Sequence, residues 1–160
     1  MIKIALALGL SAAVASAWFM PTMSFGYGEN NDNTNVDKNF VRDAQKEVVV
    51  NKKTSKMYSD TKPSPRTHFY GAWDYCQKME LAGYDDWRVI SKEEAKGLLE
   101  LSRRKITVKH AFKNVVDETY WTSTEDRYNQ SWYVDFDLGR YSTKEPIYKY
   151  RTLCVRDTIK

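Results

Sequence analysis

The stretch from Phe69 to Arg88 constrains the fold more than any other part of this chain, because it predicts a helix, a turn and a strand entry in succession. We expect Thr67 to cap the helix and Gly83 to end it in a left-handed conformation. Cys76 falls on the buried face, so its bonding partner would hold the helix in the fold. That face is an apolar stripe at helical spacing, formed by Ala72, Trp73, Cys76 and Met79.

Residues 1–17 have the pattern of a secretory signal. Lys3 supplies the positive charge, an apolar stretch follows it, and Ala15-Ser16-Ala17 is an A-x-A cleavage site. We therefore expect the mature chain to begin near Trp18, in the periplasm or outside a bacterial cell. The alternative is an uncleaved membrane anchor, because Trp18-Phe19-Met20 extends the apolar run to about 17 residues, the lower limit for a span.

Residues 18–39 are predicted to form a flexible tether, since their segment GYGENNDNTNVDKN has few apolar side chains to offset the entropy cost of ordering. A single domain then occupies residues 40–160, because about 120 residues suffice for one hydrophobic core. The formal charge of +4 is too small to imply a general affinity for nucleic acid. The 11 tyrosines and 5 tryptophans favour a recognition protein, since they supply large contact areas with polar tips.

The chain contains two cysteines, Cys76 and Cys154. An oxidising compartment would allow them to pair, and the export signal leads us to expect this disulfide. The bond would close a loop of about half the chain, for which chain entropy gives about 4 kcal/mol of stabilisation as an upper guide. The alternative is two separate buried thiols, which behave as small hydrophobic side chains.

Strands are predicted on both sides of this first helix. Residues 47–50 and 56–59 form a hairpin around a turn at 51–54, and residues 86–90 form a further strand. Ser91-Lys92-Glu93-Glu94 is a capping box, which predicts the start of a second helix. The residues of this second helix that are expected to face inward are Ala95, Leu98, Leu99 and Ser102.

The last third of the chain is rich in predicted strands, at residues 118–124, 131–137, 140–142 and 150–156. In the last of these strands, Leu153 and Val155 share one face while Cys154 points to the other. If Cys154 reaches Cys76, the first helix lies on that face or the strand is covered on both sides. In the predicted strand at residues 131–137, every second side chain is expected to be buried; these residues are Trp132, Val134 and Phe136.

Residues 103–113 carry five cationic side chains and a histidine, His110. Clustered cations bind sulfated or phosphorylated chains through charge-assisted contacts, so this segment is a candidate polyanion site. The alternative is a solvated helix end, where cations complement the negative end of the helix dipole. The candidate polyanion-binding residues are Arg103, Arg104, Lys105, Lys109 and Lys113.

Several motifs in a fixed order carry a family resemblance: Leu81-Ala82-Gly83-Tyr84-Asp85-Asp86-Trp87-Arg88, Tyr120-Trp121-Thr122-Ser123-Thr124, Ser131-Trp132-Tyr133-Val134-Asp135-Phe136 and Cys154-Val155-Arg156. Together they resemble the C-terminal domain family of collagen-like bacterial adhesins, the Lcl type, over about residues 47–157. The resemblance implies an α+β fold like that of C-type lectins and formylglycine-generating enzymes, with two helices packed on a small, twisted, mostly antiparallel sheet with long loops. It also implies recognition of polysaccharide, such as sulfated glycosaminoglycan.

Metal and cofactor motifs are few. Lectins of the implied fold hold calcium with a Glu-Pro-Asn or Gln-Pro-Asp loop, whereas this chain has Glu145-Pro146-Ile147, so we expect no such site. Asp135 and Asp137 are the remaining calcium candidates, because hard cations need clustered oxygen ligands. The alternative is that these two carboxylates face water or pair with arginine. His68 and His110 are the two histidines, and without a His/Cys cluster we expect neither zinc nor another cofactor.

These observations predict an exported, non-enzymatic recognition domain that binds anionic polysaccharide or a cell-envelope ligand. The alternatives are an assembly module that binds another envelope protein, and an enzyme on a formylglycine-generating-like scaffold. The expected partners include no nucleic acid, and a membrane only through an uncleaved signal segment. Trp87 is expected in the core rather than as a sugar platform. The aromatic candidates for ligand binding are Tyr128, Tyr133, Tyr141 and Tyr148.

Overall fold

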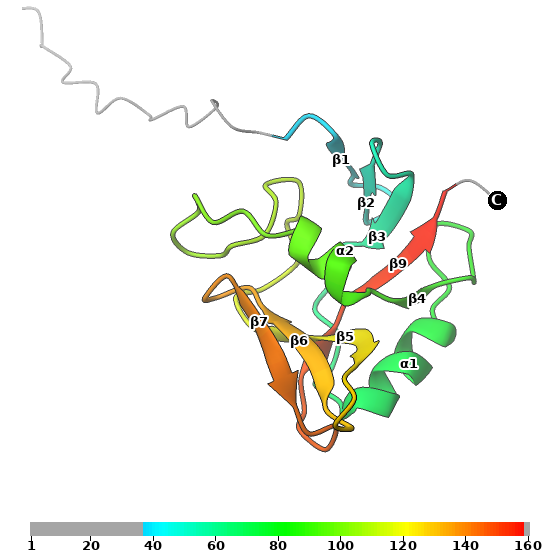
Figure 1. The fold of residues 1–160 in the computed structure, drawn as a ribbon. Coiled ribbons are helices and arrows are strands. Elements are labelled where there is room, and N and C mark those ends of the chain that lie inside the picture. Colours follow the sequence, from blue (N-terminus) through cyan, green and yellow to red (C-terminus); the bar gives the residue numbers. More distant parts are fainter. Residues whose placement is uncertain (1–36, 159–160) are drawn as a thin grey trace, which may run out of the picture. The chain divides into compact units, whose positions relative to one another are not determined.

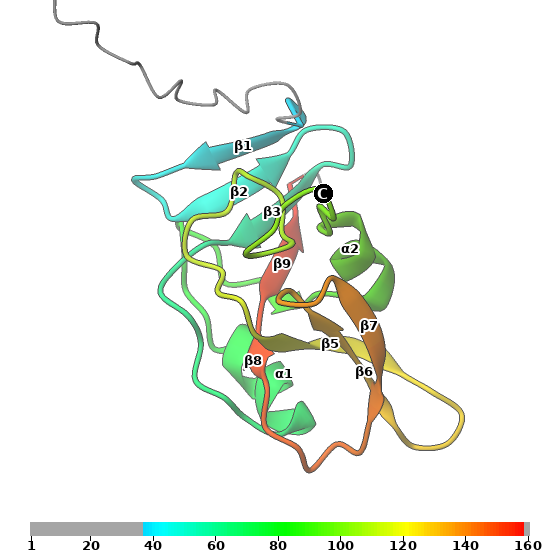
Figure 2. The same cartoon turned by 90° about the vertical axis from the view of Figure 1, so that its left-hand side faces the viewer.

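The structure, a computed structural model, describes residues 37–158 (Figures 1 and 2). The predicted signal at 1–17 and residues 18–36 of the predicted tether lie outside the described residues. The described chain forms two helices, α1 (Phe69–Gln77) and α2 (Lys92–Gly97), together with two sheets, so the domain belongs to the α+β class. Of its helices, neither is long and apolar enough to cross a membrane.

The first sheet is antiparallel throughout and contains the predicted hairpin of residues 47–50 and 56–59. The sequence patterns missed its outermost strand, β1 (Phe40–Asp43), and predicted its last strand only as part of a longer strand at residues 150–156. That last strand, β9 (Cys154–Asp157), lies inside the sheet, between β3 and β4 (Figure 1), and its first residues are part of the core. In spatial order the strands are β1 (Phe40–Asp43), β2 (Val48–Asn51), β3 (Lys56–Ser59), β9 (Cys154–Asp157) and β4 (Arg88–Val89).

The second sheet was not expected, and the prediction of one small sheet is wrong. The predicted strand at 150–156 is interrupted at Leu153, so the chain leaves the second sheet after Thr152 and enters the first at Cys154. At the break, the carbonyl of Leu153 accepts a hydrogen bond from the backbone nitrogen of Ile90 (3.1 Å). In spatial order the strands are β7 (Arg140–Lys144), β6 (Ser131–Asp135), β5 (Thr119–Glu125) and β8 (Arg151–Thr152), with β8 parallel to β5.

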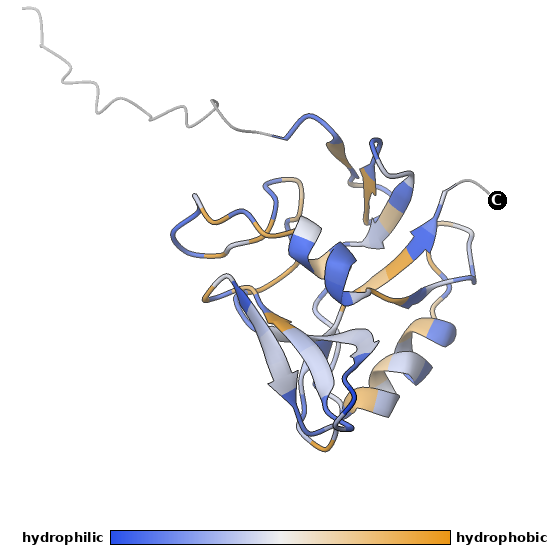
Figure 3. Cartoon of the chain, viewed as in Figure 1, coloured by the Kyte–Doolittle hydropathy of each residue, from blue (hydrophilic) through white to orange (hydrophobic). Residues whose placement is uncertain are grey.

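The chain around β9 is covered on both sides, which is one of the two arrangements expected if Cys154 reaches Cys76. Leu153 and Val155 belong to a core cluster that includes Phe136, whereas Cys154 belongs to a second cluster with Cys76. Figure 3 shows the change along β9 from an apolar middle to a hydrophilic end. Each face of the strand therefore has its own core.

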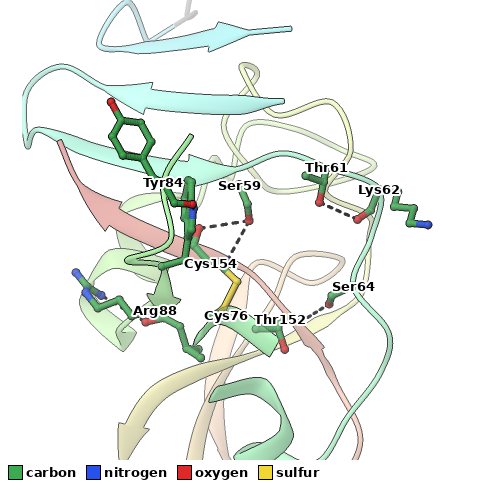
Figure 4. The surroundings of a disulfide bond; sticks show 11 residues. Ser59, Thr61, Lys62, Ser64, Cys76, Tyr84, Arg88, Thr152 and Cys154 are labelled. Atoms are coloured by element: carbon green, nitrogen blue, oxygen red, sulfur yellow. Dashed lines mark hydrogen bonds between the residues drawn. A yellow bond between two sulfur atoms is a disulfide. The ribbon is translucent and has the colours of Figure 1, made fainter. Parts of the chain in front are cut away.

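The predicted disulfide between Cys76 and Cys154 is present, with the two Cα atoms 5.6 Å apart. It joins α1 to β9. Figure 4 shows its surroundings, where the Ser59 hydroxyl accepts a hydrogen bond from the backbone nitrogen of Cys154 (3.2 Å). Ser59 thus links β3 to the residue that carries the bond.

Helix α1 differs from its prediction at both ends. Its N-cap is His68 rather than Thr67, because Nδ1 of His68 accepts a hydrogen bond from the backbone nitrogen of Gly71 (3.1 Å). The helix ends at Gln77, and Gly83 lies in a later tight turn with Ala82, both with positive φ (81° and 57°). The buried face consists of Phe69, Ala72 and Cys76; Met79 is partly buried, and Trp73 is exposed at the edge of that face.

Helix α2 begins at the predicted capping box. The backbone nitrogen of Glu94 donates to the Ser91 hydroxyl (3.2 Å), and the backbone nitrogen of Ser91 donates to the Glu94 carboxylate (2.8 Å). Ala95 and Leu98 are buried and Leu99 is partly buried, but Ser102 is exposed because the helix has already ended at Gly97. Residues 103–113 are therefore an irregular segment and not a helix end.

The Glu94 carboxylate also pairs with Arg88 (2.6 Å) and Lys56 (3.4 Å). Burial alone would raise the pKa of Glu94, but hydrogen bonds from Arg88 and from the Ser91 backbone, with the charges of Arg88 and Lys56, outweigh it and lower the pKa to about 2. Because the folded pKa is depressed, this stabilisation is present above the ordinary pKa of 4.5 and is lost as the pH falls towards 2.

Replacing Glu94 by glutamine is therefore expected to flatten the acid limb of the stability profile. The difference in unfolding free energy between the wild type and the variant should be largest above about pH 5 and should shrink towards about pH 2. Urea denaturation across this range measures it. A difference that stays constant with pH would show that the Glu94 charge is not responsible.

Candidate functional site

Three tyrosines from β6 and from the chain between β7 and β8 lie in contact with one another on the second sheet. The ring of Tyr150 is in the middle, with its centroid 5.3 Å from that of Tyr133 and 6.5 Å from that of Tyr148, on which it stacks. The ammonium group of Lys144 lies 4.5 Å from the centroid of Tyr148, and Lys149 is exposed beside it. We call these five residues the tyrosine–lysine surface.

Strand register places Tyr133 on this face. Tyr133 lies opposite Trp121 of β5, and directly opposed side chains point to the same side of a sheet. Trp121 is fully buried, and its ring lies 4.6 Å from that of Tyr150. The tyrosines therefore rest on a packed core residue.

The segment that carries Tyr148 and Tyr150 is fastened to the start of α1. The backbone nitrogen of Thr67 donates a hydrogen bond to the carbonyl oxygen of Tyr150 (2.8 Å), and the backbone nitrogen of Tyr150 donates one to the carbonyl oxygen of Thr67 (3.0 Å). The backbone nitrogen of Phe69 donates to the carbonyl of Pro146 (3.0 Å). These bonds hold the exposed rings in place, which reduces the entropy that a ligand must remove.

Two open hollows share Lys149 in their lining. One, of about 260 Å³, is lined by Arg66, Glu118, Thr119 and Tyr150, and the other, of about 230 Å³, by His68, Tyr70, Pro146 and Ile147. Burial, followed by the neighbouring Tyr133 and Tyr148, raises the pKa of Tyr150, so its phenol stays protonated and can donate a hydrogen bond. The surface thus combines aromatic faces, phenol donors and ammonium groups.

The structure divides the predicted aromatic residues. Tyr133 and Tyr148 meet through Tyr150, whereas Tyr141 lies on the opposite face of the sheet, 6.1 Å from the ring of Trp132. Tyr128 is 69% exposed in the turn between β5 and β6. Tyr150, Lys144 and Lys149 were not among the binding residues predicted from the sequence. The alternation of Tyr148, Lys149 and Tyr150 was the available signal for Tyr150, because alternate residues of an extended segment share a face.

The predicted polyanion residues do not form one continuous cationic face. Arg103 donates to the carbonyl of Val108 (2.7 Å), and Lys109 pairs with Glu100 (3.1 Å) and Asp37 (3.5 Å). Contacts within the protein therefore engage two of the five cations. The exposed ones are Arg104, Lys105 and Lys113.

The two calcium candidates have different surroundings. Asp135 is buried, and its Oδ1 accepts hydrogen bonds from the backbone nitrogens of Asp137 (3.0 Å) and Leu138 (3.1 Å), while Asp137 is exposed. The other oxygen of Asp135 faces Arg140 at 3.6 Å. Between residues 37 and 158, no three His, Cys, Asp or Glu side chains are grouped so that they could hold a metal ion.

Trp87 lies in the core, as expected, and not on a sugar-binding surface. It is 2% exposed and packs in the same cluster as the disulfide. Its indole nitrogen donates to the carbonyl of Tyr84 (3.1 Å). The aromatic recognition candidates are therefore the tyrosines of the second sheet.

Comparison with known proteins identifies the family. No curated protein matches the chain. Among solved structures, botrocetin is similar with a TM-score of 0.44 and 10% sequence identity, over 77% of this chain and 99% of botrocetin. The family model of the Lcl C-terminal domain matches residues 39–156, which contain both helices and nearly all of both sheets. The chain therefore belongs to the Lcl C-terminal domain family.

Proposed function

We propose that this domain is an exported, non-enzymatic recognition module that binds anionic polysaccharide through the tyrosine–lysine surface. The observation that carries this proposal is the stacked pair of Tyr148 and Tyr150 with Lys144 over the Tyr148 ring. Aromatic faces suit the apolar faces of sugar rings, and phenols supply hydrogen bonds at their edges. Ammonium groups pair with the carboxylates and sulfates of such chains.

The shape of this region also suits a chain-like ligand. Lys149 lines both open hollows, so consecutive units of a polymer could occupy the two hollows and share this cation. The predicted export signal and the disulfide support a periplasmic or extracellular location. The family resemblance supports a C-type-lectin-like arrangement of the two helices and sheets.

A second candidate is an assembly module that binds another envelope protein. Ile147 is 78% exposed and Tyr70 is 62% exposed, and both line the hollow of about 230 Å³. Exposed aromatic and branched side chains around a hollow are typical of the anchors in protein interfaces. This candidate predicts binding to one protein that salt affects little, because salt screens interactions between exposed charges and apolar contacts carry no charge to screen.

Elution from immobilised heparin in a salt gradient tests the first candidate. A variant with Tyr148→Ala and Lys144→Ala should bind about tenfold more weakly and elute at lower salt, because it loses a stacking ring and a cation. Tyr148→Phe alone should elute close to the wild type, since the ring face remains. The chain without residues 1–17 is the protein to use.

The matched control removes two exposed lysines from the turn between β2 and β3, Lys52→Ala with Lys53→Ala. If this control shifts elution as much as the Tyr148 and Lys144 variant, retention reflects net charge and the proposed site is wrong. If heparin does not retain the wild type while Ile147→Ser abolishes salt-insensitive capture of one envelope protein, the second candidate replaces the first.

A further inference from the structure

Two exposed leucines lie on loops that are far apart in the sequence and meet in the fold. Leu101, in the loop after α2, is 70% exposed, and Leu138, in the turn between β6 and β7, is 56% exposed. Both loops project to the same side of the molecule (Figure 1). Gly139 has a φ of +64°, and a Cβ there would lie 2.6 Å from Cδ2 of Leu101, so the Leu101 side chain packs against the turn beside Leu138.

The base of the Leu101 loop is firmly held. The backbone nitrogen of Glu100 donates to the carbonyl of Thr107 (2.7 Å), and that of Lys109 donates to the carbonyl of Leu98 (2.9 Å). Thr107 in turn donates to the carbonyl of Phe136 through both its backbone nitrogen (2.7 Å) and its hydroxyl (2.8 Å). The loop is therefore fastened to the turn that carries Leu138.

Three cationic side chains lie on, or directly after, the two loops that carry these leucines. Arg104 and Lys105 are exposed at the tip of the loop, and the Arg140 side chain is 63% exposed at the start of β7. Asp137 is the exposed acid of the same turn. Arg140 also faces the buried Asp135 at 3.6 Å, so the cations outnumber the acid only among the exposed side chains of these loops. We call Leu101, Leu138, Arg104, Lys105 and Arg140 the leucine–cation surface.

We propose that the leucine–cation surface docks on a bilayer containing anionic phospholipid. Leu101 and Leu138 enter the boundary between headgroups and acyl chains, and the cations pair with lipid phosphates. Single exposed apolar residues are ordinary, but two on adjoining loops that also carry cations combine the apolar and electrostatic contributions to membrane binding.

The leucines favour a bilayer over a polysaccharide as the occupant of this surface. Exposed apolar side chains gain free energy when they leave water for an apolar phase, which a bilayer provides and a hydrated anionic polysaccharide does not. This inference goes beyond the proposed function and departs from the expectation that the protein meets a membrane only through its signal segment.

The two surfaces lie at opposite ends of β7. Arg140 begins this strand and belongs to the leucine–cation surface, and Lys144 ends it and belongs to the tyrosine–lysine surface. The domain can therefore hold a lipid surface and a polysaccharide at the same time. The two binding activities are also separable by mutation.

Co-sedimentation with vesicles tests the proposal on the chain without residues 1–17, so that the predicted signal cannot supply the membrane contact. The wild type should bind to vesicles that contain phosphatidylglycerol and phosphatidylcholine. It should bind much more weakly to vesicles of phosphatidylcholine alone. Leu101→Ser with Leu138→Ser should weaken binding about tenfold. Arg104→Ala with Lys105→Ala should weaken it about fivefold for each charge removed. Thermal melting checks that each variant is folded.

Matched controls remove similar groups elsewhere. Val41→Ser changes another exposed apolar residue, and Lys52→Ala with Lys53→Ala removes two exposed cations; both should bind vesicles as the wild type does. A Leu138→Trp variant reports insertion directly, because its emission should shift to the blue on anionic vesicles. Equal binding by the leucine variant and the wild type, or no blue shift, would overturn the proposal.

The same variants separate this proposal from the proposed function. Leu101→Ser with Leu138→Ser should leave elution from heparin unchanged, and Tyr148→Ala should leave vesicle binding unchanged. If Arg104→Ala with Lys105→Ala weakens heparin binding while the wild type does not sediment with anionic vesicles, this surface is a polysaccharide site and the bilayer proposal fails.

Discussion

Replacing both Cys76 and Cys154 by alanine is expected to lower the free energy of unfolding by about 4 kcal/mol. The bond joins residues 78 positions apart, so its loss frees a long loop in the unfolded chain. Both half-cystines are fully buried in the core cluster that contains Trp87 and Trp121. The melting temperature, measured by circular dichroism, should fall by about 10–20 °C.

Reduction provides the control for this result. A reducing agent should bring the melting temperature of the wild type close to that of the double variant and should leave the variant unaffected. Mass spectrometry under non-reducing conditions should find the peptides of Cys76 and Cys154 linked. A wild type whose thiols are shown to be reduced, yet whose melting temperature is unchanged, would contradict the prediction.

Replacing Asp60 by asparagine is expected to cost about 3–5 kcal/mol of stability. Asp60 is 1% exposed and pairs with Arg42 (2.5 Å). Its carboxylate also accepts hydrogen bonds from the backbone nitrogens of Lys113 (3.1 Å) and Asn114 (3.0 Å). An amide cannot neutralise Arg42 and has one acceptor oxygen in place of two. Urea denaturation measures the loss.

Asp60 also ties the irregular chain after α2 to the end of β3. Relative to the wild type, the Asp60→Asn variant should therefore show a larger increase in the rate of amide hydrogen exchange at Lys113 and Asn114 than at the residues of β9. Asp117→Asn is the matched control, because Asp117 is exposed, and it should change stability by less than about 0.5 kcal/mol. Equal stability of the Asp60 variant and this control would show that the buried ion pair contributes little.

Local features were predictable where the interacting groups are close in the sequence. The capping box of Ser91 and Glu94 forms as predicted, because its two hydrogen bonds join residues three apart. The ends of α1 were harder, because Thr67 and His68 both carry an acceptor and the tertiary contacts of Thr67 with Tyr150 select His68 as the cap. The period-two pattern at the end of the chain correctly placed Cys154 opposite Leu153 and Val155.

The candidate site was predictable only in part. Tyrosines near the end of the chain were expected to bind ligand, but nothing local brings Tyr133 to Tyr148; Tyr150 connects them because strand register and the bonds to Thr67 place it between them. Lys109 was expected on a cationic face, but its partner Asp37 lies far away in the sequence.

By itself, the sequence determined the α+β class, the family and the start of α2. It also determined that Cys154 points to one side of the last strand while Leu153 and Val155 point to the other. These features depend on patterns within a few residues or on motifs in order. The tertiary structure alone decided that the strands form two sheets, that the chain changes sheets at Leu153, and which cations remain exposed. Those outcomes depend on pairing between distant segments, and the free energy of such pairing comes from shared burial and register that no single segment contains.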